Sequence, residues 1–222
     1  MNKNISPVSI SDLLQNIDIA FQGDLDPYLA LFGFEKNTEA GRPYYFKDFN
    51  ASILGIAHID TVNPITAPQV EGDILRSTGV DDRLGLHLLL NVLQKAGCEF
   101  DILLSTDEEI GQSTAQFFKT EKKYHWIFEF DRRESGVVLY QYDNPLLRSI
   151  LEAKGFEIHI GSFSDICYLE HLGVSGMNFG TGYRYEHQLK AEATLSMLQD
   201  QSNKFLQFYQ DYKNIRLPHP FP

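Results

Sequence analysis

The sequence predicts an α/β protein with a three-layer αβα arrangement around a mostly parallel mixed central sheet. Short apolar runs alternate with helix-like segments along most of the chain, the pattern of a parallel sheet covered on both faces. The 222 residues are 43% apolar, which is enough for one sizeable core. No repeat, low-complexity segment or Pro/Gly-rich linker divides the chain, so residues 1–222 are expected to form a single domain.

The first half of the chain contains helix and strand patterns in mixed order. They predict helices at residues 9–20, 26–33 and 83–96, strands at 44–49 and 52–58, and a hairpin at 70–77. Ser9 or Ser11 is suited to cap the first helix, because a serine hydroxyl accepts a hydrogen bond from the backbone at a helix start. Gly97 is a typical helix terminator and closes the third predicted helix.

The alternation is most regular in the second half. The predicted strands are residues 100–105, 125–130, 136–140, 156–160 and 174–179. The predicted helices are residues 113–119, 144–154, 164–171 and 191–212. Ligands bind at the carboxyl ends of the strands in open α/β sheets, so the residues after each strand are the first place to look for a site.

Charge and composition exclude several classes of protein. The net charge is -11 and no basic stripe is visible, so a nucleic-acid partner is not expected. No apolar run approaches the roughly 20 residues that a membrane span needs, and the amino terminus has no apolar core of signal-peptide length. The two cysteines, Cys98 and Cys167, match no paired metal spacing. We therefore expect a cytoplasmic protein that binds neither nucleic acid nor membranes.

Side chains able to bind a metal ion follow the predicted strands at one edge of the sheet. They are His58, Asp60, Asp81, Asp82, Asp107, Glu108, Glu109, Asp131 and His187. Taken singly, each has an ordinary explanation: a lone histidine can be a satisfied polar residue, an Asp pair can cap a helix, and a Glu pair can form a solvated turn. Several independent accidents at one edge are much less probable than one site.

The residue types suit a pair of metal ions. Two imidazoles with several carboxylates are ligands for Zn²⁺, and also for Co²⁺ or Mn²⁺. Two such ions lie about 3.5–4 Å apart and need one carboxylate to bridge them. The adjacent residues Glu108 and Glu109 point in different directions, so one can bind metal while the other faces a water molecule. The sequence thus favours metal-assisted hydrolysis.

Five short motifs lie in order between residues 52 and 188. They are His58-Ile-Asp60-Thr-Val-Asn-Pro64, Gly79-Val-Asp81-Asp82-Arg-Leu-Gly85, Asp107-Glu108-Glu109-Ile-Gly111, Phe130-Asp131 and Gly180-Thr-Gly-Tyr-Arg-Tyr-Glu-His187. Each motif is weak alone. Together, in this order, they resemble the co-catalytic zinc exopeptidases, a superfamily that includes peptidase T, the glutamyl aminopeptidases and the bacterial leucine aminopeptidases.

The resemblance implies a ligand set for two divalent metal ions. His58 and Asp131 would bind one ion, Glu109 and His187 would bind the other, and Asp81 would bridge them. The ions would be zinc, with cobalt or manganese as alternatives.

The resemblance also implies the remaining parts of the catalytic site. Glu108 would be the general base that later protonates the leaving amine, and Asp60 would orient the imidazole of His58. The peptide bond between Asp81 and Asp82 would be cis.

Three residues are candidates for binding substrate. Asp165 lies in a Ser-Asp pair like one that flanks the substrate pocket in the family, although Ser164 could instead simply cap a helix. Arg184 could face a substrate carboxylate or the reaction oxyanion. Tyr183 could line the pocket or simply pack.

One departure from the family concerns the lid or dimerisation domain that many relatives carry. Asp131 to Phe156 leaves room only for a hairpin and a helix, so we expect a lidless catalytic domain, a monomer or small homo-oligomer. The leading function is an aminopeptidase on small peptides, using metal-bound hydroxide and a Glu general base. The alternatives are a carboxypeptidase, an amidohydrolase on N-acyl amino acids, a single-zinc acyltransferase of the cyclase type, and an inactive metal- or peptide-binding homologue.

Overall fold

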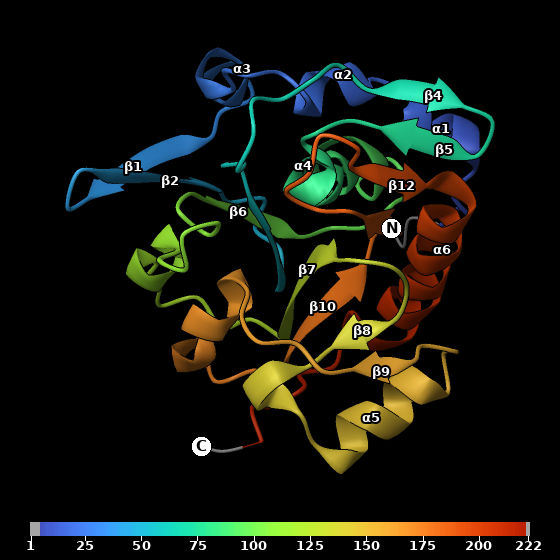
Figure 1. Ribbon diagram of the computed structural model, residues 1–222. Helices are drawn as coiled ribbons and strands as arrows, with labels where there is room; N and C mark the ends of the chain where they lie inside the picture. Colours follow the sequence, from blue (N-terminus) through green and yellow to red (C-terminus); the bar gives the residue numbers. More distant parts are fainter. Residues whose placement is uncertain (1–4, 221–222) are drawn as a thin grey trace.

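The computed structural model describes residues 5–220 and shows an α/β fold built on an eight-stranded mixed sheet (Figure 1). In spatial order the strands are β1 (Glu35–Glu39), β2 (Arg42–Lys47), β6 (Asp101–Ser105), β3 (Ile53–His58), β7 (Trp126–Arg132), β10 (Gly176–Gly180), β8 (Val137–Val138) and β9 (Ile158–His159). The central strands β6, β3, β7 and β10 are parallel, whereas β2 and β8 join them antiparallel. The predicted mostly parallel mixed sheet is confirmed.

A second, four-stranded antiparallel sheet lies beside the first. Its order is β11 (Tyr183–Arg184), β12 (Glu192–Thr194), β5 (Ile74–Arg76) and β4 (Gln69–Glu71). The predicted hairpin at residues 70–77 is therefore confirmed as β4 and β5. The prediction of one helix over residues 191–212 is wrong at its start, because Glu192–Thr194 pairs with β5 and the helix begins only at Leu195.

The helices are shorter than their sequence patterns predict. They are α1 (Ile10–Leu14), α2 (Ile17–Ala20), α3 (Asp26–Leu31), α4 (Val80–His87), the π-helix η1 (Leu88–Val92), α5 (Pro145–Glu152) and α6 (Leu195–Tyr212). Ser9 caps α1 in a capping box with Asp12, as predicted. The helix predicted over residues 9–20 is broken, since Asn16 adopts a left-handed conformation with φ of 62°.

The helices predicted at residues 113–119 and 164–171 are instead short 3₁₀ turns. These are η2 (Thr114–Phe117), η4 (Asp165–Tyr168) and η5 (Glu170–Leu172), and a further turn, η3 (Tyr140–Tyr142), follows β8. Between β7 and β10 the chain forms β8, η3, α5, β9, η4 and η5.

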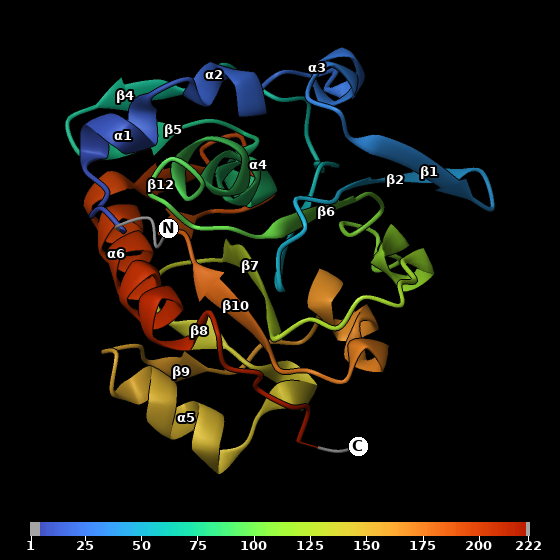
Figure 2. The same ribbon diagram turned by 180° about the vertical axis from the view of Figure 1, so that it is seen from behind.

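The sheet separates two apolar layers. On one face α4 packs against β3 and β7, and α6 packs against β10. On the other face η4 contacts β3, β7 and β10, and η2 lies beside η4; Figure 2 shows the same arrangement from behind. Strand β7 serves both layers by alternation, with Phe128 and Phe130 in one apolar cluster and Ile127 in the other. None of the described helices is long and apolar enough to span a membrane.

Candidate metal centre

The carboxyl ends of the central strands meet at one edge of the sheet. His58 is the last residue of β3, Asp131 lies near the end of β7, and the loop after β6 carries Glu108 and Glu109. Because β3 is paired in parallel with both β6 and β7, these residues leave the sheet side by side. His187, which follows β11, reaches the same edge, where its ring contacts Glu109.

His58 is fully buried, and its Nε2 atom faces three carboxylates. It lies 3.3 Å from Oδ1 of Asp81, 3.6 Å from Oδ1 of Asp131 and 3.9 Å from Oε2 of Glu108. On the other side of the ring, Nδ1 lies 3.0 Å from the backbone oxygen of Asp60 and 3.5 Å from its Oδ1. A proton held on Nδ1 by Asp60 leaves the Nε2 lone pair free to bind a cation.

His187 forms the second half of the centre and is half-exposed. Its Nε2 atom lies 2.8 Å from Oε2 of Glu109 and 3.4 Å from Oδ2 of Asp81. Asp81 therefore turns one carboxylate oxygen toward each imidazole. The hydrogen bond with Asp81 raises the pKa of His187 to about 9.

Three of the four separations between ligand atoms match tetrahedral coordination of an ion, whereas the 2.8 Å between His187 and Glu109 is that of a direct hydrogen bond. Two ligand atoms held about 2.0–2.2 Å from one such ion lie about 3.3–3.6 Å apart. Asp81 lies 3.3 Å from His58 and 3.4 Å from His187, and Asp131 lies 3.6 Å from His58. Nε2 of His58 and Oδ1 of Asp131 are both buried with no hydrogen-bond partner among the described residues. A buried polar atom without a partner is destabilising, and a divalent cation between the two would satisfy both.

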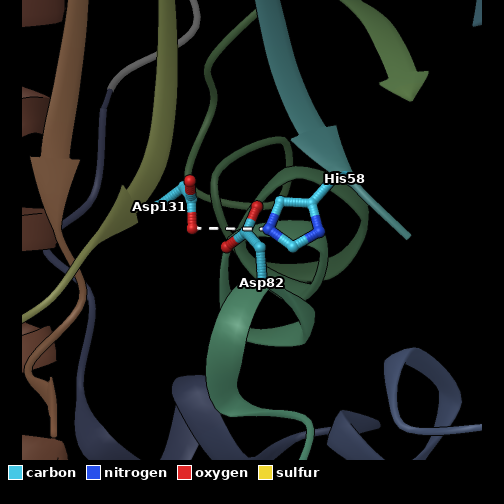
Figure 3. Close-up of side chains that lie close together, drawn as sticks. All are labelled: His58, Asp82 and Asp131. Carbon is cyan, nitrogen blue, oxygen red and sulfur yellow. Dashed lines mark ion pairs between the residues drawn. The ribbon is translucent and has the colours of Figure 1, made fainter. Parts of the chain in front are cut away.

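The start of α4 brings a further carboxylate into the centre. The Asp81–Asp82 peptide bond is cis, as the resemblance predicts. Asp82 is fully buried, and Figure 3 shows it extending from α4 toward His58 and Asp131, with which its ligand-type atoms lie within 4.8 Å. Its Oδ1 accepts a hydrogen bond from the Gly85 backbone at 2.9 Å, while no described residue donates to Oδ2.

Gly85 is what allows α4 to approach the centre so closely. A Cβ atom at this position would lie 2.3 Å from Oδ1 of Asp82 and 2.4 Å from the backbone oxygen of Phe130. Both contacts are shorter than a carbon atom tolerates, so this motif glycine has a packing role beside the metal centre.

Glu108 lies apart from the two histidine–carboxylate pairs of the centre. Its neighbour Glu109 contacts His187, whereas Glu108 faces His58, so the adjacent side chains diverge as expected. Burial raises the pKa of Glu108 to about 7; the charge of His58 opposes this, and the carboxylates of Asp165 and Asp81 add to it. A carboxyl with that pKa can accept and release a proton near neutral pH.

Asp60 connects the two sides of the centre. Besides its contacts with His58, its carboxylate accepts hydrogen bonds from the backbone N–H groups of Glu108 at 3.4 Å and of Glu109 at 3.2 Å. One residue thus orients an imidazole and supports the loop that carries the two glutamates, a wider role than the sequence predicts.

Sequence reasoning missed one acidic residue below the centre. Glu129 lies in the middle of β7, fully buried, and neither carboxylate oxygen has a hydrogen-bond partner among the described residues. The sequence does contain a signal for Glu129, because alternation along the strand puts it on the same face as Asp131. Burial raises the pKa of four carboxyls, hereafter the buried acid group: Asp82, Glu129, Asp131 and Asp165.

The three candidate substrate-binding residues lie in different surroundings. Arg184 is exposed on β11 and pairs with Glu192 at 3.4 Å. Tyr183 is only 5% exposed and belongs to the main apolar cluster. Asp165 is fully buried behind the loop of Glu108 and Glu109. None of the three side chains is therefore both exposed to solvent and free of a partner.

A comparison of the sequence with protein-family models gives no match, and no curated protein matches it. Solved structures do match. A tripeptidase from Staphylococcus aureus aligns with a TM-score of 0.68 and 11% identity over 94% of this chain and 100% of that chain. Aminopeptidase PepT from Bacillus cereus aligns with a TM-score of 0.65 and 11% identity over 92% and 99% of the two chains.

A third structure carries the link to zinc. A protein from Bacteroides vulgatus, described with a proposed Zn-dependent exopeptidase function, aligns with a TM-score of 0.57 and 11% identity over 96% of this chain and 99% of that chain. This chain therefore has the same fold as these three structures, which is the fold that the resemblance in the five sequence motifs implies.

Proposed function

We propose that the chain is a two-metal exopeptidase that acts as an aminopeptidase on small peptides. The observation that carries the proposal is the position of Asp81 between two histidine–carboxylate pairs, with one oxygen toward each. The unpartnered ligand atoms of His58 and Asp131 support it, because a cation between them satisfies both at once. The neighbours with this fold include a tripeptidase and an aminopeptidase, which supports a peptide substrate.

The chemistry follows from the arrangement of the side chains. Two divalent ions, Zn²⁺ or alternatively Co²⁺ or Mn²⁺, would supply Lewis acidity to the scissile carbonyl and to the attacking water. Each histidine–carboxylate pair would hold one ion, and Asp81 would contact both. Glu108, which belongs to neither pair, would take a proton from the attacking water and deliver it to the leaving amine. Its pKa of about 7 suits both transfers.

A specific observation favours a second candidate, the recognition of a substrate carboxylate. Arg133 is paired with Glu186 at 3.1 Å and Arg184 with Glu192, so neither guanidinium is free. Arg132 directly follows the ligand Asp131, and its Nε atom is buried without a hydrogen-bond partner among the described residues. A carboxypeptidase or an amidohydrolase on N-acyl amino acids would use such a cation.

A substrate panel separates the two candidates. Amino-acid anilides, dipeptides and N-acyl amino acids would be offered to the protein with zinc added and then with chelator. An aminopeptidase cleaves the anilides, which have a free amine but no carboxylate. Cleavage of N-acyl amino acids alone, lost in Arg132→Met, would establish the second candidate. Failure to cleave any of them with metal present would refute the proposal.

A further inference from the structure

The pair Ser164-Asp165 lies beneath the metal centre and is fully buried. Ser164 occupies the N-cap position of η4 but makes no side-chain capping hydrogen bond, so the alternative of simple helix capping is wrong. Its hydroxyl is used elsewhere: Oγ donates to Oδ2 of Asp131 at 3.1 Å and accepts from Nδ2 of Asn178 at 3.1 Å. Ser164 therefore holds a side chain of the first ion site.

Asp165 holds the other side of the centre. Its Oδ1 accepts a hydrogen bond from Oγ of Ser105 at 2.7 Å and a second from Oγ of Ser113. Ser105 is the last residue of β6, and Ser113 follows the loop that carries Glu108 and Glu109. A single carboxylate oxygen thus fixes both ends of that loop.

The closure by Asp165 adds to a bond between the loop ends, in which the backbone N–H of Thr114 donates to the oxygen of Thr106 at 2.9 Å, and to local bonds within the loop. The backbone N–H of Gly111 donates to the oxygen of Glu108 at 2.7 Å, and that of Gln112 donates to the oxygen of Asp107 at 3.0 Å. These bonds shape the turn but do not attach it to the sheet. Asp60, Tyr168 and the β2 residues Arg42 and Pro43 attach the loop to the rest of the fold. Asp165 adds an attachment that joins Ser105 and Ser113, at the two ends of the loop.

The pair itself is held rigidly by the layer around η4. Ile166 is buried in the apolar cluster on that face, and its backbone oxygen accepts from the hydroxyl of Tyr142 at 2.6 Å. The backbone oxygen of Cys167 accepts from Nε2 of Gln141 at 3.0 Å. A support fixed by the core can transmit its position to the ligands above it.

We propose that Ser164 and Asp165 form a positioning pair that sets the two ion sites relative to each other. Ser164 holds Asp131 at the first site, and Asp165 holds the loop of Glu108 and Glu109 at the second. Asp165 acts through the loop and does not contact substrate. The inference rests on the proposed two-metal site, and its first test does not depend on metal or activity.

The first test is hydrogen exchange of the backbone amides of residues 106–112 in the metal-free protein. The variants are Asp165→Asn and the double variant Ser105→Ala/Ser113→Ala, which removes the same hydrogen bonds from the opposite side and also the bond that Ser113 accepts from the backbone of Ala115. Asp101→Asn is the matched control, since Asp101 is equally buried but lies at the other end of β6. Exchange in the loop should be at least about 10-fold faster in the first two variants and unchanged in the control. Equal exchange in Asp165→Asn and Asp101→Asn would overturn the inference.

The second test is calorimetric titration with Zn²⁺, with His187→Ala used to identify which binding event belongs to the second site. Ser164→Ala should weaken the first site, and Asp165→Asn the second, each by about 10–100-fold. If each variant weakened zinc binding equally at both sites, the assignment of Ser164 to the first site and Asp165 to the second would be overturned. If the wild-type protein binds two ions and shows this split but cleaves no peptide, the positioning pair stands and the proposed function fails.

Discussion

Buried carboxylates lie at both ends of strand β6, and their surroundings differ. At the amino end, Asp101 is fully buried but every oxygen is occupied. Its Oδ1 accepts from the backbone N–H groups of Phe49 at 2.9 Å and Ala51 at 3.1 Å. Its Oδ2 accepts from Lys122 at 2.6 Å and from the hydroxyl of Tyr124 at 2.9 Å. The protein satisfies this charge by itself, so Asp101 is a structural residue.

At the carboxyl end, the hydrogen bonding of the buried acid group is incomplete. Among the described residues, at least one carboxylate oxygen of each member has no hydrogen-bond partner, and both oxygens of Glu129 lack one. The nearby Nε2 of His58 also lacks one. Burial of so many acceptors without donors is destabilising unless a cation is present. Burial therefore does not by itself distinguish Asp101 from the buried acid group; the unpartnered carboxylate oxygens do, and they indicate a place for a cation.

Removal of the metal should produce the largest difference between the two ends. Chelation is expected to abolish hydrolysis and to lower stability, since an ion at 100 times its dissociation constant stabilises the fold by about 2.7 kcal/mol. Activity assays and thermal melts with chelator and then with excess zinc measure both effects. Hydrolysis that persists after complete removal of metal would contradict the two-metal account.

The next largest effect is expected from Glu108→Gln. The variant keeps the shape of the side chain and the metal ligands but cannot move a proton, so kcat should fall about 10²–10⁴-fold with zinc binding unchanged. Asp107→Asn is the control from the same loop, because Asp107 faces Arg42 at 3.4 Å. Wild-type turnover in Glu108→Gln would rule out its role as the general base.

Two substitutions, one at each end of β6, test the contrast between Asp101 and the buried acid group. Asp101→Asn should lower the free energy of unfolding of the metal-free protein by about 1.5–3 kcal/mol, because hydrogen bonds to a charged group are lost, and leave zinc affinity unchanged. Asp131→Asn should raise the melting temperature of the metal-free protein, because it removes an incompletely paired buried charge, and weaken zinc binding. Denaturant titration and calorimetry measure the two quantities. If the two variants changed stability in the same direction and zinc affinity by the same amount, the contrast between the two ends of β6 would be wrong.

Gly85→Ala probes how closely α4 approaches the centre. The added methyl group would meet Oδ1 of Asp82 and the oxygen of Phe130, so a loss of about 1–3 kcal/mol is expected, together with weaker zinc binding. Gly23→Ala is the matched control, since nothing lies within 4 Å of a Cβ there. Its effect should stay below about 0.5 kcal/mol. Equal melting temperatures for both variants would refute the packing argument.

The smallest predicted effect is a pH dependence of stability in the metal-free protein. The raised pKa values of the buried acid group mean that the folded state binds more protons than the unfolded state, so stability falls as pH rises above about 4. His187 acts in the same direction: its contribution is complete below about pH 6.5 and is lost as pH rises through about 9. Thermal melts with chelator should therefore show a fall between about pH 6 and 9 that zinc removes. A constant or rising melting temperature would contradict the assigned shifts.

The sequence predicts the central strands, and the side chains that meet at their carboxyl edge, because both have strong local signals. Continuous apolar runs locate β3, β6, β7 and β10 to within a few residues, since strands buried on both faces contain little else. The residues that follow them are brought together simply because parallel strands end at one edge.

The remainder depends on contacts between distant segments. Strand β1 is mostly exposed and polar, so nothing local marks it, and only its pairing with β2 makes it a strand. The turns η2 and η4 have helix-like patterns but stay short, and their starts are joined by a hydrogen bond between the distant residues Ser113 and Asp165. Glu129 and Ser164 became visible as parts of the centre only once β7 and η4 were placed together.

The proposed function requires two divalent ions at the carboxyl edge of the sheet, with Asp81 between them. Anomalous diffraction at the zinc absorption edge, from crystals grown with zinc, would locate such ions. We expect two strong peaks about 3.5–4 Å apart, one beside His58 and Asp131, the other beside Glu109 and His187, with Asp81 contacting both. A single peak, or peaks away from these side chains, would contradict the proposed function.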